Sequence, residues 1–314
     1  MKYFVVFREI DGSTATVKND SCGNTQFLYD GILHPVYKFL DCIKMNFKRV
    51  LLIALLGLTV QVVGAQELIL AVNEGVTYQD GGPISERYKP LIELLEKELK
   101  HPVKVQAVDH YSDFESGLDA EKYDLVFIHP AQIGLRAVKS GKYFGLATAK
   151  DFTDYHARVM VKKDSPAKTI NDLRGKKIGV PALESITTVM ITANLVELGF
   201  QNPASFYTAT RYQDAVPFMI ENGFVEAGVT ASGAVVKDWI AKGGRVIAET
   251  KPIPIKQFLA SRKLSAEQRE KVQELMLKLS DSDAGKVALK DINMKGFVPW
   301  NDAVMADATK RLGL

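Results

Sequence analysis

The chain has 314 residues, enough for about two domains of ~150 residues each. With 46% hydrophobic and 25% charged residues it matches ordinary globular usage, which excludes a disordered chain, a fibrous repeat and a disulfide-rich mini-protein. Its 40 basic and 37 acidic residues leave a net charge of +3, too balanced for a dedicated nucleic-acid binder. The two cysteines, Cys22 and Cys42, are too few and too close to the start to frame a fold.

Residues 45–65 carry the parts of a secretory signal peptide. A basic start at Met45–Arg49 precedes a short apolar run and then small residues up to Ala65. The run is shorter than the about 20 apolar residues of a membrane span. We therefore expect export to the periplasm with cleavage after Ala65, and an uncleaved anchor is the alternative. Residues 1–44 are then either an over-extended start or a genuine extension.

The first part of the exported chain alternates expected strands with helices. Short apolar or alternating segments predict strands at 68–72, 102–108 and 124–128. Leucines at helical spacing predict a helix over 85–100, and Pro130 is placed to lie in the first turn of another. Repeated β–α units of this kind predict a parallel-rich sheet with helices on both faces.

A second set of such units is expected between Tyr155 and residue 255. Its expected elements occupy residues 157–163, 169–175, 177–181, 185–198, 205–209, 211–221, 227–230, 234–242 and 245–250. The prolines of 251–255 keep that segment extended, so it can return the chain to the first set. Beyond it, Ser265 is expected to cap a helix over 265–279, with Gln268 three places on.

The sequence thus predicts an α/β protein of two Rossmann-like lobes joined by a two-segment hinge. Lobe 1 comprises 66–154 and 256–314, and lobe 2 comprises 155–255. Two chain crossings between α/β lobes predict a hinge and a cleft. Ligands of such sheets bind outside the carboxyl ends of the strands and at helix N-termini, so this cleft is the expected binding site.

Several motifs follow one another in an ordered combination. They are Tyr-Lys-Pro-Leu at 88–91, Tyr111, Tyr-Asp-Leu-Val-Phe at 123–127, Val-Lys-Lys-Asp-Ser-Pro at 161–166, Asp-Leu-Arg-Gly-Lys-Lys at 172–177, Asn-Gly-Phe-Val-Glu-Ala-Gly at 222–228 and Pro-Ile-Pro at 252–254. Over essentially all of 66–314 the chain resembles the phosphate/phosphite/phosphonate-binding periplasmic proteins of ABC transporters. That family has the type 2 periplasmic-binding-protein fold, and the resemblance implies the same fold here.

The resemblance also implies a pocket of tyrosines and helix-start hydroxyls. The family places one tyrosine on the loop after the second strand, where Tyr111 stands, and another before the strand that enters lobe 2, where Tyr155 stands. Its Ser-Thr-Ser at a helix start corresponds to Ser185, Ile186 and Thr187, followed here by Thr188. The first and third hydroxyls persist, and the second is replaced by isoleucine.

Other family positions differ in chemistry. A histidine that is usual before the next helix corresponds to Tyr212. Acidic residues that recognise an amino group in aminoalkyl-phosphonate binders correspond to Gly233 and Lys256. Losing carboxylates and gaining a lysine removes the attraction for an ammonium and adds one for an anion. A small anion is therefore the expected ligand, ahead of a phosphonate with a positive tail.

The helix start and the tyrosines each have a simpler interpretation. The N–H groups and dipole of the helix that Ser185 opens favour an anion, but Ser185 can also serve only as a helix cap. Glu184 beside it disfavours an anion. Tyr111 and Tyr155 can donate phenolic hydrogen bonds to a ligand or simply pack half-buried.

The histidines and basic residues leave further alternatives open. His129 precedes Pro130 at a strand end, where it can bind an oxyanion or cap the following helix. His110, His129 and His156 lack short ligand spacing on one helix, so we expect no metal. Lys256 and Arg211 are candidate charge partners of the ligand, with solvated surface charge as the alternative.

No Gly-rich phosphate loop, nucleophile elbow or His-Glu-x-x-His motif is present, so we expect neither an enzyme nor a cofactor. We expect a monomeric periplasmic solute-binding protein that captures phosphate, phosphite or a phosphonate-like oxyanion and then docks on an ABC permease with its ATPase. A sensory protein coupled to a receptor kinase is the alternative from another class. Uptake of a non-phosphoryl ligand and an enzyme on the same fold are further alternatives.

Overall fold

The computed structural model describes residues 16–19, 25–29, 32–33, 66–75 and 82–314. The predicted signal peptide at 45–65 lies outside these residues, as does the rest of 1–44. In the N-terminal unit, β1 (Thr16–Asn19), β2 (Thr25–Tyr29) and β3 (Ile32–Leu33) form an antiparallel sheet. The second unit begins at Ala65 and contains everything described below. Within the described residues, no helix combines the length and apolarity needed to cross a bilayer.

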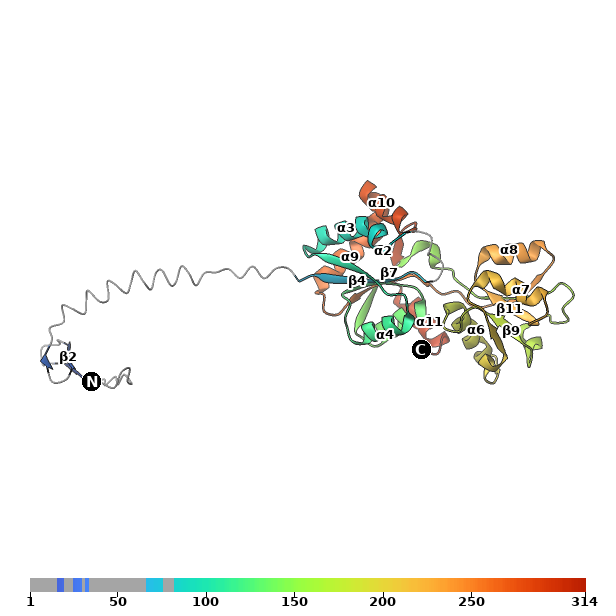
Figure 1. Ribbon diagram of the computed structural model, residues 1–314, viewed down its shortest axis with the longest axis horizontal. Helices are drawn as coiled ribbons and strands as arrows, with labels where there is room; N and C mark the ends of the chain where they lie inside the picture. Colours follow the sequence, from blue (N-terminus) through green and yellow to red (C-terminus); the bar gives the residue numbers. More distant parts are fainter. Residues whose placement is uncertain (1–15, 20–24, 30–31, 34–65, 76–81) are drawn as a thin grey trace. The chain divides into compact units, whose positions relative to one another are not determined.

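Lobe 1 is built on a six-stranded sheet with the order β14-β7-β13-β6-β4-β5. Figure 1 shows β4 and β7 of this sheet, with α3 above and α4 below. Its strands are β4 (Leu68–Asn73), β5 (Val103–Ala107), β6 (Leu125–Ile128), β7 (Tyr143–Ala149), β13 (Gln257–Ser261) and β14 (Phe297–Pro299). Its helices are α2 (Ile84–Arg87), α3 (Lys89–Leu99), α4 (Tyr111–Asp119), α5 (Ala131–Lys139), α9 (Ala266–Lys278), α10 (Asp283–Asp291) and α11 (Asp302–Arg311). Short 3-10 helices follow at Lys150–Phe152 and Leu279–Asp281.

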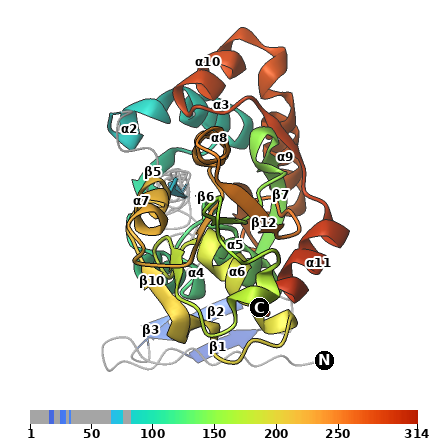
Figure 2. The ribbon, with the colours of Figure 1, turned by 90° about the vertical axis from the view of Figure 1, so that its right-hand side faces the viewer.

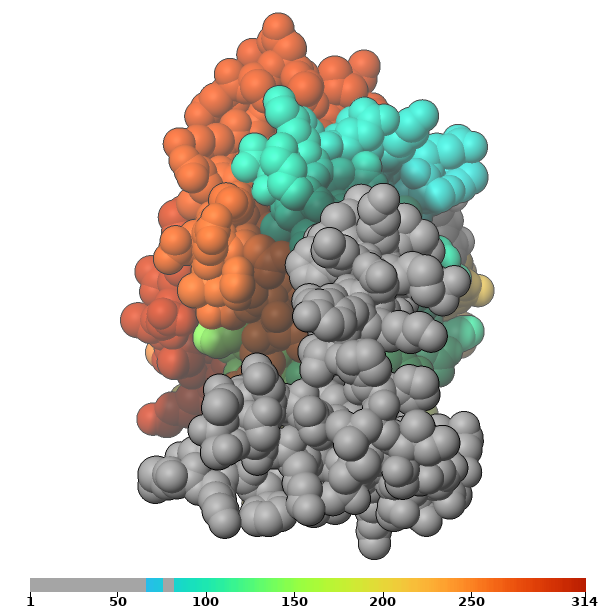
Figure 3. Space-filling model, turned by 90° about the vertical axis from the view of Figure 1, so that its left-hand side faces the viewer, coloured from blue at the N-terminus to red at the C-terminus, as the bar shows by residue number. Residues whose placement is uncertain are grey.

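Alternating strand residues bury both faces of this sheet. Leu70 and Phe127 point to a core shared with α3, α9 and α10, whereas Ala71 and Val126 point to a core shared with α4 and α5. Successive side chains of a strand face opposite sides, so a strand buried on both faces is apolar at every position. Figure 3 shows α3 and α10 side by side at the surface of this lobe.

Lobe 2 is built on a five-stranded sheet with the order β10-β9-β11-β8-β12. Figure 2 shows its edge strands β10 and β12. Its strands are β8 (Arg158–Val161), β9 (Ile178–Val180), β10 (Tyr207–Ala209), β11 (Ala227–Thr230) and β12 (Arg245–Glu249). Its helices are α6 (Ile186–Glu197), α7 (Val216–Glu221) and α8 (Gly233–Ala241), with 3-10 helices at Ile170–Leu173, Pro203–Phe206 and Gln213–Ala215. Residues of α6 share one core and residues of α7 and α8 another.

The expected two-lobe α/β architecture is confirmed, but the sheets are less parallel than the sequence predicted. In lobe 1 only β4 pairs in parallel with β5 and β6, and β13, β7 and β14 pair antiparallel. In lobe 2, β8 and β12 are likewise antiparallel to their neighbours. The hinge explains the antiparallel pairing of β13. The chain returns from lobe 2 at the edge of the sheet where β6 ends, so β13 must run in the direction opposite to β6.

The helix predicted over 85–100 is divided at Tyr88 into α2 and α3. Pro90 lies in the first turn of α3 and has no N–H to donate to the carbonyl of Glu86. Its ring would also clash with that carbonyl in a continuous helix, so α2 ends at Arg87. Helix α4, which the sequence reading left out, begins at Tyr111, so this tyrosine opens a helix instead of lying on a loop.

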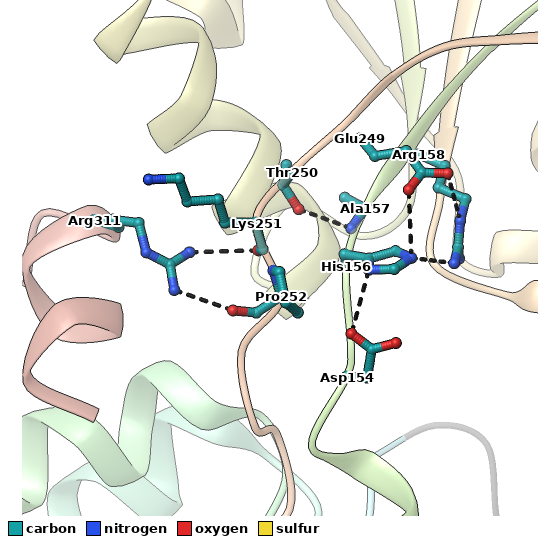
Figure 4. Close-up of polar contacts among 9 residues, drawn as sticks. All are labelled: Asp154, His156, Ala157, Arg158, Glu249, Thr250, Lys251, Pro252 and Arg311. Carbon is teal, nitrogen blue, oxygen red and sulfur yellow. Dashed lines mark hydrogen bonds and ion pairs between the residues drawn. The ribbon is translucent and has the colours of Figure 1, made fainter. Parts of the chain in front are cut away.

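The two hinge segments are joined to each other and to the C-terminal helix. Tyr155 and Ile253 form an antiparallel bridge, and the Ala157 N–H donates to Thr250 Oγ1 at 3.0 Å. Figure 4 shows Arg311 of α11 donating to the main-chain oxygens of Lys251 and Pro252, at 3.3 and 3.0 Å. The same view shows the side chain of His156 lying among those of Asp154, Arg158 and Glu249.

Arg311→Met is expected to lower the free energy of unfolding by about 1 kcal/mol, because two charge-assisted hydrogen bonds to the return segment are lost. Urea denaturation followed by circular dichroism measures this change. Lys310→Met, which removes an equal charge from the same helix, is the matched control and is expected to change stability by less than about 0.5 kcal/mol. Equal losses in the two variants would show that α11 does not secure the hinge through Arg311.

Candidate functional site

A hydrogen-bonded chain of side chains joins the first hinge segment to the N-terminus of α6. The Tyr155 hydroxyl and Thr187 Oγ1 lie 2.7 Å apart, and Gln213 Nε2 donates to the same hydroxyl at 3.2 Å. Burial raises the pKa of Tyr155, and its hydrogen bonds to Thr187 and Gln213 lower it less. The phenol therefore remains protonated at neutral pH and can act as a donor.

Gln213 is the one residue of this hydrogen-bonded set that the sequence did not indicate. Its Oε1 accepts from the Ala231 N–H at 2.6 Å and from Thr230 Oγ1 at 3.0 Å. Since a main-chain N–H can only donate, the amide oxygen must face Ala231 and the amide nitrogen must face Tyr155. Gln213 thereby connects the end of β11 to Tyr155 of the hinge.

The neighbouring Tyr212, which the sequence indicated, lies elsewhere. Its side chain is 43% exposed and stacks beneath the guanidinium of Arg211, whose Cζ lies 5.2 Å from the ring centroid. In the part of the chain that the structure describes, no hydrogen bond or ring contact joins Tyr212 to Tyr155 or Thr187. Gln213, the next residue, has the polar side chain that turns inward to Tyr155 and Ala231. Matching the family histidine one residue later would have indicated Gln213.

The hydroxyls of Ser185 and Thr188 hold the start of α6. Ser185 Oγ accepts from the Thr188 N–H at 3.2 Å and donates to Thr188 Oγ1 at 3.1 Å. Thr188 Oγ1 in turn donates to the main-chain oxygen of Pro181 at 3.2 Å. Ser185 is therefore a helix cap. Of the three predicted hydroxyls, Thr187 is the one that bonds to the hinge residue Tyr155.

The first turn of α6 also presents main-chain donors. The N–H groups of Ile186 and Thr187 have no intrahelical acceptor, and neither forms a hydrogen bond with another described residue. The Ile186 side chain is buried in the core that lies behind the helix, so the loss of a hydroxyl at this position leaves its N–H in place. With the positive end of the helix dipole, these groups favour an anion.

In lobe 1, Gln132 contacts the loop before α6, and Tyr111 lies within electrostatic range of Glu184 in that loop. Burial first, then the negative charge of Glu184 and the phenol of Tyr155, raise the pKa of Tyr111 to about 12. Tyr111 is therefore a protonated donor near both residues at neutral pH. The Gln132 Nε2 of α5 donates to the main-chain oxygen of Glu184 at 2.9 Å, which brings the N-termini of α5 and α6 together.

His129 lies at the end of β6 and packs edge-on against Tyr155, with the ring centroids 6.4 Å apart. A Cβ at position 75 would lie 2.4 Å from its Cδ2, so Gly75 leaves the space that the imidazole fills. Burial, followed by the positive charge of Lys256, lowers the pKa of His129 to about 3. The imidazole is therefore neutral at physiological pH.

Lys256 is buried, so the alternative that it is a solvated surface charge is wrong. Lys256 is 2% exposed, and its Nζ lies 4.5 Å from the ring centroid of Phe152. Burial lowers the pKa of Lys256 to about 7, against the opposing attraction of Glu74 and with the added repulsion of Arg87. Glu74 is in turn bound by both guanidinium nitrogens of Arg87 and by the Tyr88 hydroxyl at 2.8 Å.

The structure therefore brings together four of the eight predicted site residues in two groups. Tyr155 and Thr187, with Gln213, form the group in lobe 2, while His129 and Lys256 form the group in lobe 1. Within the described residues, no three histidine, cysteine or acidic side chains are arranged to hold a metal ion.

Comparisons with known proteins agree on the class. Residues 76–305 match the family model described as the periplasmic substrate-binding protein of the phosphonate ABC transporter. No curated protein sequence matches the chain.

Solved structures share its fold at low identity. XAC2383 from Xanthomonas citri bound to ATP is 14% identical, with a TM-score of 0.64 over 79% of this chain and 98% of that one. PhnD1 from Prochlorococcus marinus in complex with methylphosphonate is 15% identical, with a TM-score of 0.56 over 78% and 96%. A binding-protein component of an ABC phosphonate transporter from Pseudomonas aeruginosa is 15% identical, with a TM-score of 0.56 over 79% and 85%. The type 2 periplasmic-binding-protein fold is thereby confirmed.

Lys256→Met is expected to stabilise the protein, and more at about pH 6 than at about pH 9. The folded state lowers the pKa of Lys256 to about 7, whereas the unfolded chain restores the ordinary value. Below pH 7 the folded state therefore carries the full cost of a buried charge, and the cost falls as pH rises toward the unfolded pKa. Thermal unfolding at both pH values measures the difference, with the exposed Lys251→Met as the control. A gain that does not depend on pH would contradict the lowered pKa.

Proposed function

The chain belongs to the family of periplasmic substrate-binding proteins of phosphonate ABC transporters, and from this membership we propose that it captures a small phosphoryl oxyanion between its lobes. Proteins of this family bind a solute without converting it and work with the other components of the transporter in the periplasm. The ligand of this chain would be phosphate, phosphite or a phosphonate.

The observation that carries this proposal is the meeting of Tyr155, Thr187 and the N-terminus of α6. The Tyr155–Thr187 hydrogen bond places two hydroxyls beside the main-chain N–H groups of Ile186 and Thr187. A tetrahedral oxyanion presents several acceptor oxygens at once, and a helix N-terminus is a ready site for them. Each of these hydroxyls has one proton, so while they are bonded to each other the one that accepts directs its own proton to the ligand, as Thr187 does when Tyr155 donates to it.

Donors from lobe 1 would complete the site and couple binding to closure. Tyr111 opens α4 with a protonated hydroxyl, because burial and nearby negative charge raise its pKa to about 12. A ligand that contacts Tyr111 and Thr187 together interacts more strongly with the closed arrangement, and so shifts the population toward it. The closed form would then dock on the permease.

Two of the similar structures hold phosphoryl compounds, which supports the same chemistry here. One is bound to methylphosphonate and another to ATP. Glu184, whose charge acts on Tyr111, opposes any anion at this place, but it is exposed and therefore partly screened by solvent and salt. The neutral donors and the helix dipole would have to outweigh it.

Thr187→Val and Tyr155→Phe are each expected to weaken the binding of phosphate, phosphite or methylphosphonate by about tenfold, because each removes one hydrogen-bonding hydroxyl from a site that keeps its shape. The double variant should lose less than the product of the two factors, since the hydroxyls are bonded to each other. Isothermal titration calorimetry gives the affinities.

Thr208→Val, on the exposed edge strand β10, is the matched control and should bind as the parent does. A thermal-shift screen that includes sulfate and carboxylates sets the ligand class, because a ligand at 100 times its dissociation constant adds about 2.7 kcal/mol to stability. If no phosphoryl anion shifts the unfolding temperature while a carboxylate does, the proposed ligand class is wrong.

A further inference from the structure

The edge of the lobe 2 sheet opposite the candidate site holds a long connection between two strands. The strand register aligns the end of β8 with the starts of β9, β11 and β12, at Val161, Ile178, Ala227 and Arg245. Because β8 ends and β9 begins at this edge, residues 162–177 stay there. The N-terminus of α6 lies at the other edge, where Thr187 bonds to Tyr155. We call the first of these the distal edge.

The distal edge concentrates positive charge. Residues 162–177 contain six basic and two acidic residues, a net charge of +4, whereas residues 66–314 contain 33 basic and 32 acidic residues, a net charge of +1. The five lysines of this connection form no ion pair with another described residue. The carboxylate of Asp172 already accepts from the main-chain N–H groups of Lys168 and Thr169. The neighbouring element ends add two basic and three acidic residues, which leaves +3 for the edge: Lys242, Arg245, Glu197, Glu221 and Glu226.

Large apolar side chains are exposed at the same edge. Of the ten that are exposed among the described residues, five lie on α7 and the turn after it or at the distal ends of α6 and α8: Val196, Leu198, Phe218, Phe224 and Ile240. Phe218 and Phe224 are 58% and 56% exposed and pack edge-on, with their ring centroids 6.0 Å apart. Val216, Met219 and Ile220 already fill the core on the inner side of α7, so this pair of rings is left at the surface.

Contacts join the basic and apolar parts of the distal edge into one surface. They connect residues 162–177 with the end of α6 and with the start of β11, and the end of α7 with the end of α8. The pairs are the Arg174 guanidinium with the main-chain oxygen of Leu198 at 2.7 Å, the Lys177 N–H with Glu226 Oε2 at 2.9 Å, and Lys242 Nζ with Glu221 Oε1 at 3.5 Å.

This composition fits an anionic lipid surface better than it fits a protein. The core of a protein–protein interface is depleted in lysine, whereas lysines dominate here. A second copy of the chain, meeting this one through the same surface, would set a charge of +3 against +3. Segments that lie on anionic membranes combine lysine and arginine with phenylalanine and leucine, because electrostatic attraction adds to the burial of apolar area.

We propose that the distal edge of lobe 2 is a peripheral contact surface for an anionic lipid bilayer. Phe218 and Phe224 would enter the boundary between headgroups and acyl chains, and the lysines of 162–177 would meet the lipid phosphates. The contact would leave the opposite edge of lobe 2 open to solutes. This inference goes beyond the proposed function and does not depend on it, since no residue of the distal edge belongs to the candidate site.

Flotation of the full chain with lipid vesicles tests the proposal. The vesicles consist of phosphatidylcholine alone or with about one third phosphatidylglycerol, which supplies the negative charge. Binding to the anionic vesicles is expected to be at least about tenfold stronger than binding to the neutral ones. It should weaken as salt is added, because salt screens the attraction between lysines and phosphates.

Two variants locate the contact. Lys176→Gln combined with Lys177→Gln removes two exposed charges, and Phe224→Ser removes one exposed ring. Each is expected to weaken binding to the anionic vesicles by about tenfold.

The matched controls change exposed residues of the same types in lobe 1. Lys286→Gln combined with Lys290→Gln, and Phe144→Ser, should each bind within about twofold of the parent. All the proteins share residues 1–65, so a difference between them comes from the substituted side chains.

Three results would overturn the lipid contact: no binding to the anionic vesicles, equal binding to both kinds, or equal losses in the lobe 1 controls. A dimer that Phe224→Ser dissociates, without lipid binding, would instead assign the surface to a second copy. Binding to bacterial membranes that protease treatment abolishes, without binding to the lipid vesicles, would assign it to a membrane protein. If Phe224→Ser does not fold, as judged by its unfolding transition, the lysine variant decides by the same ratio.

Discussion

The hydrogen bond between Tyr155 and Thr187 is the interaction on which the proposed site depends. Tyr155 has its backbone in the hinge, where it bridges Ile253, and its hydroxyl at the first turn of α6. That single side chain therefore sets where the helix N-terminus lies relative to both chain crossings. Gln213 extends the restraint to the end of β11 through Thr230 and Ala231, so two lobe 2 edges are held to the hinge by one connected set of hydrogen bonds.

The two lobes offer a ligand different chemistry. Lobe 2 presents neutral hydroxyls and main-chain N–H groups, which suit the several acceptor oxygens of a phosphoryl group. Lobe 1 presents buried charge, in which Lys256 is held close to the Arg87–Glu74 pair at a cost in desolvation. A charge buried at such a cost is common at functional sites, because packing alone would favour an apolar side chain there.

Local signals predicted the elements whose causes are local. Ser265 caps α9 in a capping box with Gln268, as expected, and Gly199 follows α6 with a positive φ of 79°. The helix over 85–100 was predicted as continuous because its leucines keep helical spacing, and Pro90 outweighed that spacing. Gln213 and the burial of Lys256 were missed because neither leaves a pattern in the surrounding sequence. A glutamine after an exposed tyrosine and a lysine after a proline-rich segment look like surface residues until the chain returns between β6 and β7.

The sequence by itself determined the class of protein, the alternation of strands and helices and the two lobes, because periodicity, caps and ordered motifs act over a few residues at a time. Only the tertiary structure decided which strands run antiparallel, which hydroxyl at the start of α6 faces Tyr155, and which charges are buried. These depend on contacts between residues far apart in the chain. Lys256 meets Glu74 and His129 because β13 pairs with β6 and β6 with β4. Strand pairing within lobe 1, and not local preference, therefore gives that lysine its environment.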